Sequence, residues 1–171
     1  MPRLGQETSN LIHLTENSWL PDLTYAEGRF QAGLAIVCDE TGRISQLASD
    51  SNLDNSTRLQ NRAALPGLVN GHSHAFQRVI RGRTEYRTQN SVDSFWTWRE
   101  MMYSAAARLT PEDIYDASRM AFLEMALSGI TAVGEFHYIH NQADGTPYDD
   151  PSELALQVVH AAQDVGLRIA L

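Results

Sequence analysis

The sequence has one cysteine, Cys38, so it cannot form an internal disulfide. Basic residues are few: 13 Lys and Arg stand against 21 Asp and Glu, giving a formal net charge of −8. Nucleic-acid phosphates would repel such a chain. It also lacks the long apolar run of a membrane span and the apolar N-terminal stretch of a signal peptide. We therefore expect a cytoplasmic protein with no nucleic-acid partner and no membrane association.

The first sixty residues have the patterns of β-strands. Residues 34–38 form a short apolar run, residues 39–42 have turn composition, and residues 43–47 alternate, which predicts a β-hairpin. The mixed run over residues 11–20 is expected to end at a turn around Pro21. The polar residues 49–61 are predicted to form a loop.

From residue 64 onward, strand patterns alternate with helix patterns. One helix is predicted to begin at Thr110, with Pro111 in its first turn, and to end at Gly129. A second is predicted to begin with Asp150 as its N-cap and to end at Gly166. The predicted strands are 65–71, 130–133 and 167–171. This order predicts a parallel sheet covered by helices.

The last predicted strand is apolar, and two arrangements can accommodate it. One is a small three-stranded α/β domain with a terminal edge strand. The other is the front part of a larger barrel. Parallel strands are normally buried on both faces, and exposed apolar edges are avoided, so we favour the barrel.

Two histidines follow the strand predicted at residues 65–71. Residues i and i+2 of a strand point to the same side, so His72 and His74 are predicted to lie side by side. Neutral imidazoles are good ligands for a divalent metal such as Zn²⁺, although a catalytic zinc needs at least three protein ligands. The alternative is a pair of histidines that only form hydrogen bonds.

Residues 66–74, read Pro-Gly-Leu-Val-Asn-Gly-His-Ser-His, resemble the first-strand metal motif of the amidohydrolase superfamily. These are metal-dependent hydrolases and deaminases built on a distorted (β/α)8 barrel, often with a small β-sandwich formed partly by N-terminal residues. The resemblance implies an α/β fold in two parts. Residues 1–62 would form a small β-sandwich segment, and residues 63–171 would form the first βα units of an incomplete barrel.

Three further stretches point to one family within this superfamily. Residues 74–78, 93–103 and 135–140 are similar to the formimidoylglutamate deiminase family of histidine degradation. That similarity implies one divalent metal, Zn²⁺, held by His72 and His74. It places the remaining ligands, a His and an Asp, and the acid–base residues beyond Leu171, so no catalytic residue is expected within this segment. An N-terminal piece of this kind is expected to be inactive alone.

The implied substrate, N-formimino-L-glutamate, is a small dianion. By resemblance, Gln77, Arg99 and Tyr138 bind it. Arg99 can grip a carboxylate through two parallel hydrogen bonds, but it could instead be a helix-surface charge paired with Glu100 or Glu85. Superfamily members often dimerise, so a homodimer of the full-length protein is one expected assembly.

Two other functions remain open. A related aminohydrolase would deaminate an uncharged purine or pyrimidine ring, which has no use for the carboxylate clamp expected at Arg99. A truncated fragment without catalytic activity would only associate with a partner. Glu135, at the end of the second barrel strand, is a candidate to orient a metal ligand.

Overall fold

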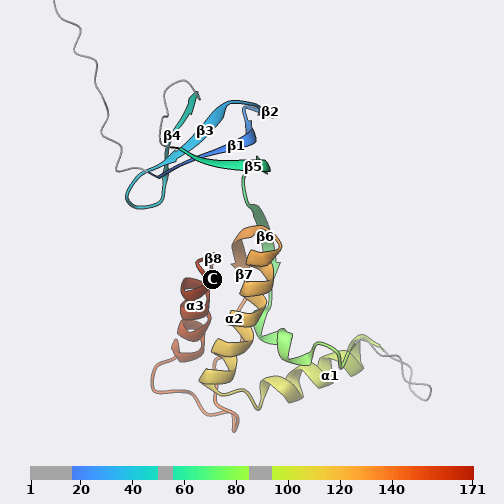
Figure 1. The fold of residues 1–171 in the computed structure, drawn as a ribbon. Coiled ribbons are helices and arrows are strands. Elements are labelled where there is room, and N and C mark those ends of the chain that lie inside the picture. Colours follow the sequence, from blue (N-terminus) through green and yellow to red (C-terminus); the bar gives the residue numbers. More distant parts are fainter. Residues whose placement is uncertain (1–16, 50–55, 85–93) are drawn as a thin grey trace, which may run out of the picture. The chain divides into compact units, whose positions relative to one another are not determined.

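The structure of the chain, a computed structural model, describes residues 17–49, 56–84 and 94–171. Its contacts divide the chain into two compact units, Met1–Pro66 and Gly67–Leu171 (Figure 1). The start of the run predicted from residue 11, together with Glu85 and Asp93, lies outside the described residues. The assignment of residues 1–62 and 63–171 as domains stays a prediction.

The first unit holds a five-stranded sheet with the order β2-β1-β3-β4, in which β5 pairs in parallel with β1. Its strands are β1 (Asn17–Ala26), β2 (Arg29–Gln31), β3 (Leu34–Cys38), β4 (Ile44–Ser49) and β5 (Thr57–Ala64). The predicted hairpin is confirmed, since β3 and β4 pair antiparallel. The Asp39 carboxylate closes its turn by accepting the backbone N–H groups of Thr41 and Arg43.

Two sequence predictions in this unit are wrong. The turn expected around Pro21 is absent, because β1 runs through it. The register against β5 shifts between Pro21 and Leu23, and such an irregularity tolerates a residue without a backbone donor. Residues 57–61 were expected in a loop but form part of β5, because pairing with β1 satisfies this polar segment's backbone.

The second unit is a three-stranded parallel sheet with the order β6-β7-β8. Its strands are β6 (Leu68–Ser73), β7 (Ile130–Glu135) and β8 (Arg168–Ala170), and its helices are the 3-10 helix η2 (Ala75–Ile80), α1 (Phe95–Ala106), α2 (Pro111–Leu127) and α3 (Glu153–Val165). Helices α2 and α3 pack against each other, α2 contacts β7 and α3 contacts β8 (Figure 1). The predicted alternation of strands and helices is confirmed.

The ends of α2 and α3 follow the predicted chemistry in all but one place. Thr110 caps α2, accepting the Asp113 N–H through its hydroxyl while the Asp113 carboxylate accepts the Thr110 N–H. The glycine predicted to end α3, Gly166, has a φ of +80°. Asp150 is not the N-cap of α3: its carboxylate accepts the N–H of Ser152, so a turn precedes the helix and Ser152 takes the cap position.

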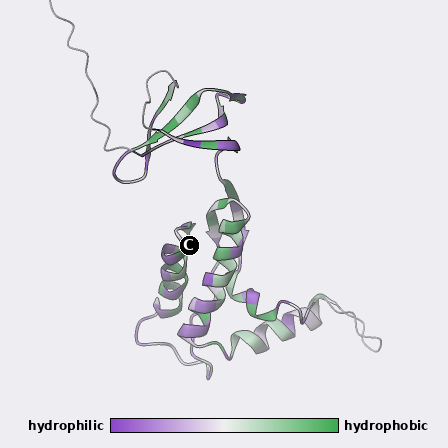
Figure 2. Cartoon of the chain, in the orientation of Figure 1, coloured by the Kyte–Doolittle hydropathy of each residue, from purple (hydrophilic) through white to green (hydrophobic). Residues whose placement is uncertain are grey.

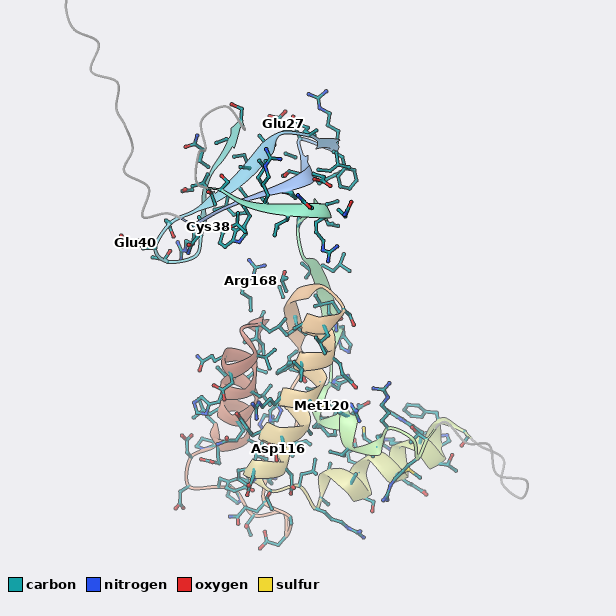
Figure 3. The ribbon with its side chains drawn as sticks, in the orientation of Figure 1. Glu27, Cys38, Glu40, Asp116, Met120 and Arg168 are labelled. Atoms are coloured by element: carbon teal, nitrogen blue, oxygen red, sulfur yellow. The ribbon has the colours of Figure 1, made fainter. Side chains whose placement is uncertain are left out.

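A hydrophobic core fixes η2, α2 and α3 against the sheet. Its largest fully buried side chains in this unit are Phe76, Phe122, Ile114, Leu154 and Val158. Hydrophobic and hydrophilic residues alternate along α2, as Figure 2 shows, and its exposed positions include Asp116 and Met120, labelled in Figure 3. Because Phe76 belongs to η2, this core sets the place of η2 directly after the two histidines. No helix among the described residues is long and apolar enough to cross a membrane.

Candidate functional site

The predicted pair of histidines lies where β6 ends. His72 is in the strand and His74 directly follows it. Their Nε2 atoms are 3.1 Å apart, and their rings meet edge to face with centroids 4.6 Å apart. The side-by-side placement expected from the i, i+2 spacing is therefore present in the structure.

The His74 ring has a fixed tautomer. Its Nδ1 lies 2.8 Å from the backbone carbonyl oxygen of Phe136, which can only accept, so Nδ1 carries the proton and donates it. In the neutral form of the ring, the lone pair is then on Nε2, the atom that faces Nε2 of His72. Metal-ligating histidines are commonly oriented by such a second hydrogen bond.

The spacing of the two Nε2 atoms agrees with a shared metal ligand sphere. Nitrogens about 2.0–2.1 Å from one tetrahedral ion would lie roughly 3.3–3.4 Å apart. The observed 3.1 Å is close to that value. No third His, Cys, Asp or Glu completes a metal-binding group within residues 17–49, 56–84 and 94–171. The two imidazoles thus fit a divalent metal as a partial set of ligands.

The next strand closes tightly against this motif. A Cβ placed on Gly134 of β7 would lie 2.9 Å from the carbonyl oxygen of Gly71, the residue before His72. Only a glycine fits there without moving the backbone of β6. The strands can therefore approach closely enough for the Phe136 carbonyl to reach His74, a requirement that sequence patterning did not reveal.

The structure brings together two of the three predicted substrate-binding residues. Gln77 of η2 donates an amide hydrogen to the hydroxyl of Tyr138, which follows β7, over 2.9 Å. The Tyr138 ring packs against His74 with centroids 5.0 Å apart. The Tyr138 hydroxyl also lies 3.1 Å from the sulfur of Met102, a contact that sequence reasoning missed. Burial raises the pKa of Tyr138, although the hydrogen bond from Gln77 acts against this rise, so its hydroxyl stays protonated at neutral pH.

Arg99, the third predicted residue, lies apart from that pair on α1. Its exposed guanidinium stands over the rings of Tyr103 and Trp96, 4.9 Å and 5.7 Å from their centroids. Among the described residues, no hydrogen bond or ion pair joins Arg99 to Gln77, Tyr138 or Glu100. The proposed partner Glu85 lies outside the described residues, so that alternative stays open.

A small cavity lies between α1 and the segment after β7. Its volume is about 210 Å³, and its lining includes Tyr103, Tyr138, His140 and Gln142. The ring of Tyr103 that supports Arg99 therefore borders the same space as Tyr138. Of the three predicted substrate-binding residues, Tyr138 alone lines this cavity, while Gln77 and Arg99 each contact one of its lining residues.

Two more histidines follow β7. The rings of His137 and His140 meet edge to face with centroids 5.4 Å apart, and the Nε2 atom of His137 is buried without a hydrogen-bond partner in the described part of the chain. Burial lowers the pKa of His137, because the imidazolium form is poorly solvated there. A neutral His137 suits a packing role at this buried position.

The second unit has the architecture of the α/β class, with polar side chains gathered at the carboxyl ends of its first two strands, where barrel enzymes place their active sites. Residues 63–171 match the Amidohydrolase family. The chain therefore belongs to this family.

Two curated relatives from Pseudomonas aeruginosa illustrate the range of the match. A protein named formimidoylglutamate deiminase is 46% identical over 130 residues, which cover 76% of this chain and 28% of the relative. A protein named 8-oxoguanine deaminase is 37% identical over 123 residues, covering 67% of this chain and 25% of the relative. The chain spans only about a quarter of the length of either relative.

Solved structures share the same architecture. An amidohydrolase from Brucella melitensis aligns with a TM-score of 0.73 and 31% identity, covering 91% of this chain and 34% of that one. An adenosine deaminase from Xanthomonas campestris, solved with bound zinc, aligns with a TM-score of 0.65 and 19% identity, covering 90% of this chain and 33% of that one. The latter shows the fold alone. The chain thus has the fold of the N-terminal part of a (β/α)8 hydrolase barrel.

Proposed function

We propose that this chain forms the N-terminal part of a metal-dependent deiminase that converts N-formimino-L-glutamate and water into N-formyl-L-glutamate and ammonia. The observation that carries the proposal is the pair of Nε2 atoms 3.1 Å apart, with the tautomer of His74 fixed by Phe136. The 46% identical relative named formimidoylglutamate deiminase supports the choice of substrate.

His72 and His74 would hold the metal through their Nε2 atoms, with further ligands supplied by later strands. We favour Zn²⁺, because it suits imidazole ligands and is present in the adenosine deaminase of the same fold. When bound, such a metal supplies a Lewis acid that activates water at neutral pH. In this reaction the water oxygen becomes the formyl oxygen, and the formimino nitrogen leaves as ammonia.

The other residues would bind and orient the dianionic substrate. Gln77 and Tyr138 offer an amide and a hydroxyl next to His74. Arg99 offers a guanidinium whose hydrogen atoms are largely free for a carboxylate, because its main contacts in the described chain are with aromatic faces. In this proposal, the residues of this chain hold the substrate, while acid–base catalysis belongs to later parts of the barrel.

The test measures ammonia release by the complete enzyme carrying Arg99→Met. A charged hydrogen bond contributes about 1.5–3 kcal/mol, so KM for N-formimino-L-glutamate should rise roughly ten- to hundredfold. Arg108→Met removes an exposed arginine just beyond the end of α1 and serves as the control. An unchanged KM in Arg99→Met would argue against a carboxylate clamp.

A ring deaminase is the second candidate, favoured by the 37% identity with a protein named 8-oxoguanine deaminase. Release of ammonia from 8-oxoguanine but not from N-formimino-L-glutamate would support it. The 171-residue chain alone should release no ammonia from either compound, because the part of it that the structure describes offers two ligands, too few for a catalytic metal. Turnover by the chain alone would overturn the proposed division of labour, whereas a zinc-free chain that binds a partner protein would favour a fragment without catalytic activity.

A further inference from the structure

We propose that Glu135 is a positioning residue for the metal-binding motif: its buried carboxylate anchors the backbone behind His74 and supplies a negative charge beside the two imidazoles. The inference rests on the proposed function, because it concerns the same metal site. Glu135 is the last residue of β7 and is 5% exposed.

The carboxylate is tied directly to the residue after His74. Oε1 of Glu135 accepts the backbone N–H of Ala75 over 2.6 Å, and an ionised acceptor makes such a hydrogen bond stronger than a neutral one. Ala75 is the first residue of η2, and His74, in the cap position, provides no side-chain hydrogen bond to that helix. Glu135 therefore fixes an N–H group that the start of a helix leaves without an acceptor.

The residue directly after β7, Phe136, makes two further hydrogen bonds to the motif. The Phe136 carbonyl accepts the Nδ1 proton of His74, and the Phe136 N–H donates to the carbonyl of Ser73 over 2.8 Å. Glu135 and Phe136 thus form hydrogen bonds to three consecutive residues, 73–75. This attachment lies where the β6–β7 register shifts between Asn70 and Ser73 and regular pairing alone does not set the position of the chain.

The presence of a glutamate at this buried position calls for an explanation beyond this hydrogen bond. A glutamine carbonyl could accept the same N–H without the cost of burying a charge. Oε2 of Glu135 is also buried, with no hydrogen-bond partner among the described residues. The other buried polar side chains of the described chain, Ser18, Thr24 and Ser118, are uncharged. In the proposed role, this carboxylate, bonded to the residue directly after His74, would offset part of the positive charge of a divalent cation held by His72 and His74.

Three variants of the complete enzyme separate the anchor from the charge. Glu135→Gln keeps the size and an acceptor oxygen but removes the charge, Glu135→Ala removes both, and Glu135→Asp keeps the charge on a shorter arm. The matched control is Ser118→Ala in α2, away from the motif: it alters another buried side chain with an oxygen that has no hydrogen-bond partner among the described residues. Zinc affinity is measured by competition with a chromophoric chelator, without substrate.

Partners that orient metal ligands typically contribute 10–100-fold to metal affinity. We expect zinc affinity to fall about tenfold in Glu135→Gln and about a hundredfold in Glu135→Ala, with Glu135→Asp recovering part of the loss. The visible spectrum of the Co²⁺-substituted protein should change in Glu135→Ala and stay unchanged in Ser118→Ala. Urea unfolding of the metal-free proteins distinguishes a local loss from general damage.

Zinc affinities within twofold of the wild type in Glu135→Gln and Glu135→Ala would overturn the inference, as would an equal loss in Ser118→Ala. If Glu135→Ala does not fold, Glu135→Gln alone decides. A wild-type enzyme that binds zinc but releases no ammonia from N-formimino-L-glutamate would refute the proposed substrate and leave the role of Glu135 standing. A wild-type enzyme that binds no zinc would refute both.

Discussion

Replacing Gly134 by alanine should separate β6 from β7 at the histidine motif. The new Cβ would lie 2.9 Å from the carbonyl oxygen and 3.3 Å from the carbonyl carbon of Gly71. Carbon–oxygen contacts between strands normally lie at about 3.3–3.6 Å, so the backbones must part by roughly half an ångström. The obstructing atoms belong to the main chain and cannot rotate away. Overpacking of this kind costs about 1–3 kcal/mol.

Gly71→Ala provides the control from the opposite strand. A Cβ at Gly71 meets nothing within 4 Å, and neither glycine has a positive φ. Both substitutions restrict the unfolded chain to the same extent, so their difference isolates the contact between the strands. Urea unfolding should show Gly134→Ala about 1–3 kcal/mol less stable than Gly71→Ala.

Zinc binding provides a second measurement on the same pair. Because the displaced backbone at Gly71 leads directly into His72, Gly134→Ala should also bind zinc more weakly than Gly71→Ala. Equal stabilities and equal zinc affinities for the two variants would refute the argument that close strand approach sets the site.

Two further predictions concern the packing and the charges of α2. Phe122 is fully buried, so Phe122→Ala should lower the free energy of unfolding by about 3–5 kcal/mol, whereas Leu127→Ala, at a position 80% exposed, should change it by less than about 0.5 kcal/mol. The backbone N–H of Thr110 and then its hydroxyl hold the pKa of Asp113 below its ordinary 3.8, so this stabilisation is present above pH 3.8 and disappears as the pH falls through the lower folded-state value. The stability difference between wild type and Asp113→Asn should therefore shrink in acid, and a difference constant from pH 7 to pH 2 would contradict this reasoning.

Local chemistry made much of the second unit predictable. The Thr110 side chain caps α2, and Pro111 occupies the first turn of that helix. Gly166 ends α3 in a left-handed conformation that glycine favours. The i, i+2 spacing likewise placed His72 beside His74. Each of these features depends on residues within a few positions of one another, which a sequence displays directly.

The wrong or missing predictions have two causes. Either a contact with a residue distant in the sequence outweighed the local preference, or two local hydrogen-bonding arrangements were both available. Pro21 would favour a turn in isolation, but pairing with β5 keeps it in β1. Asp150 could cap α3, yet its carboxylate instead takes an N–H two residues ahead. The contact between Gln77 and Tyr138 spans 61 positions and depends on the register of β6 against β7. Family resemblance named both residues, but the sequence pattern could not pair them.

The acceptor for His74 is the main-chain carbonyl of Phe136, which a side-chain substitution does not remove. Because His74 is held by the backbone of Phe136, exchanging the phenylalanine side chain leaves the acceptor in place. Position 136 can therefore change identity while the imidazole keeps its tautomer. Deleting one residue of β7 would instead shift every following carbonyl and turn side chains to the opposite face. Natural variants should consequently tolerate substitution at position 136 far better than a change in the length of β7.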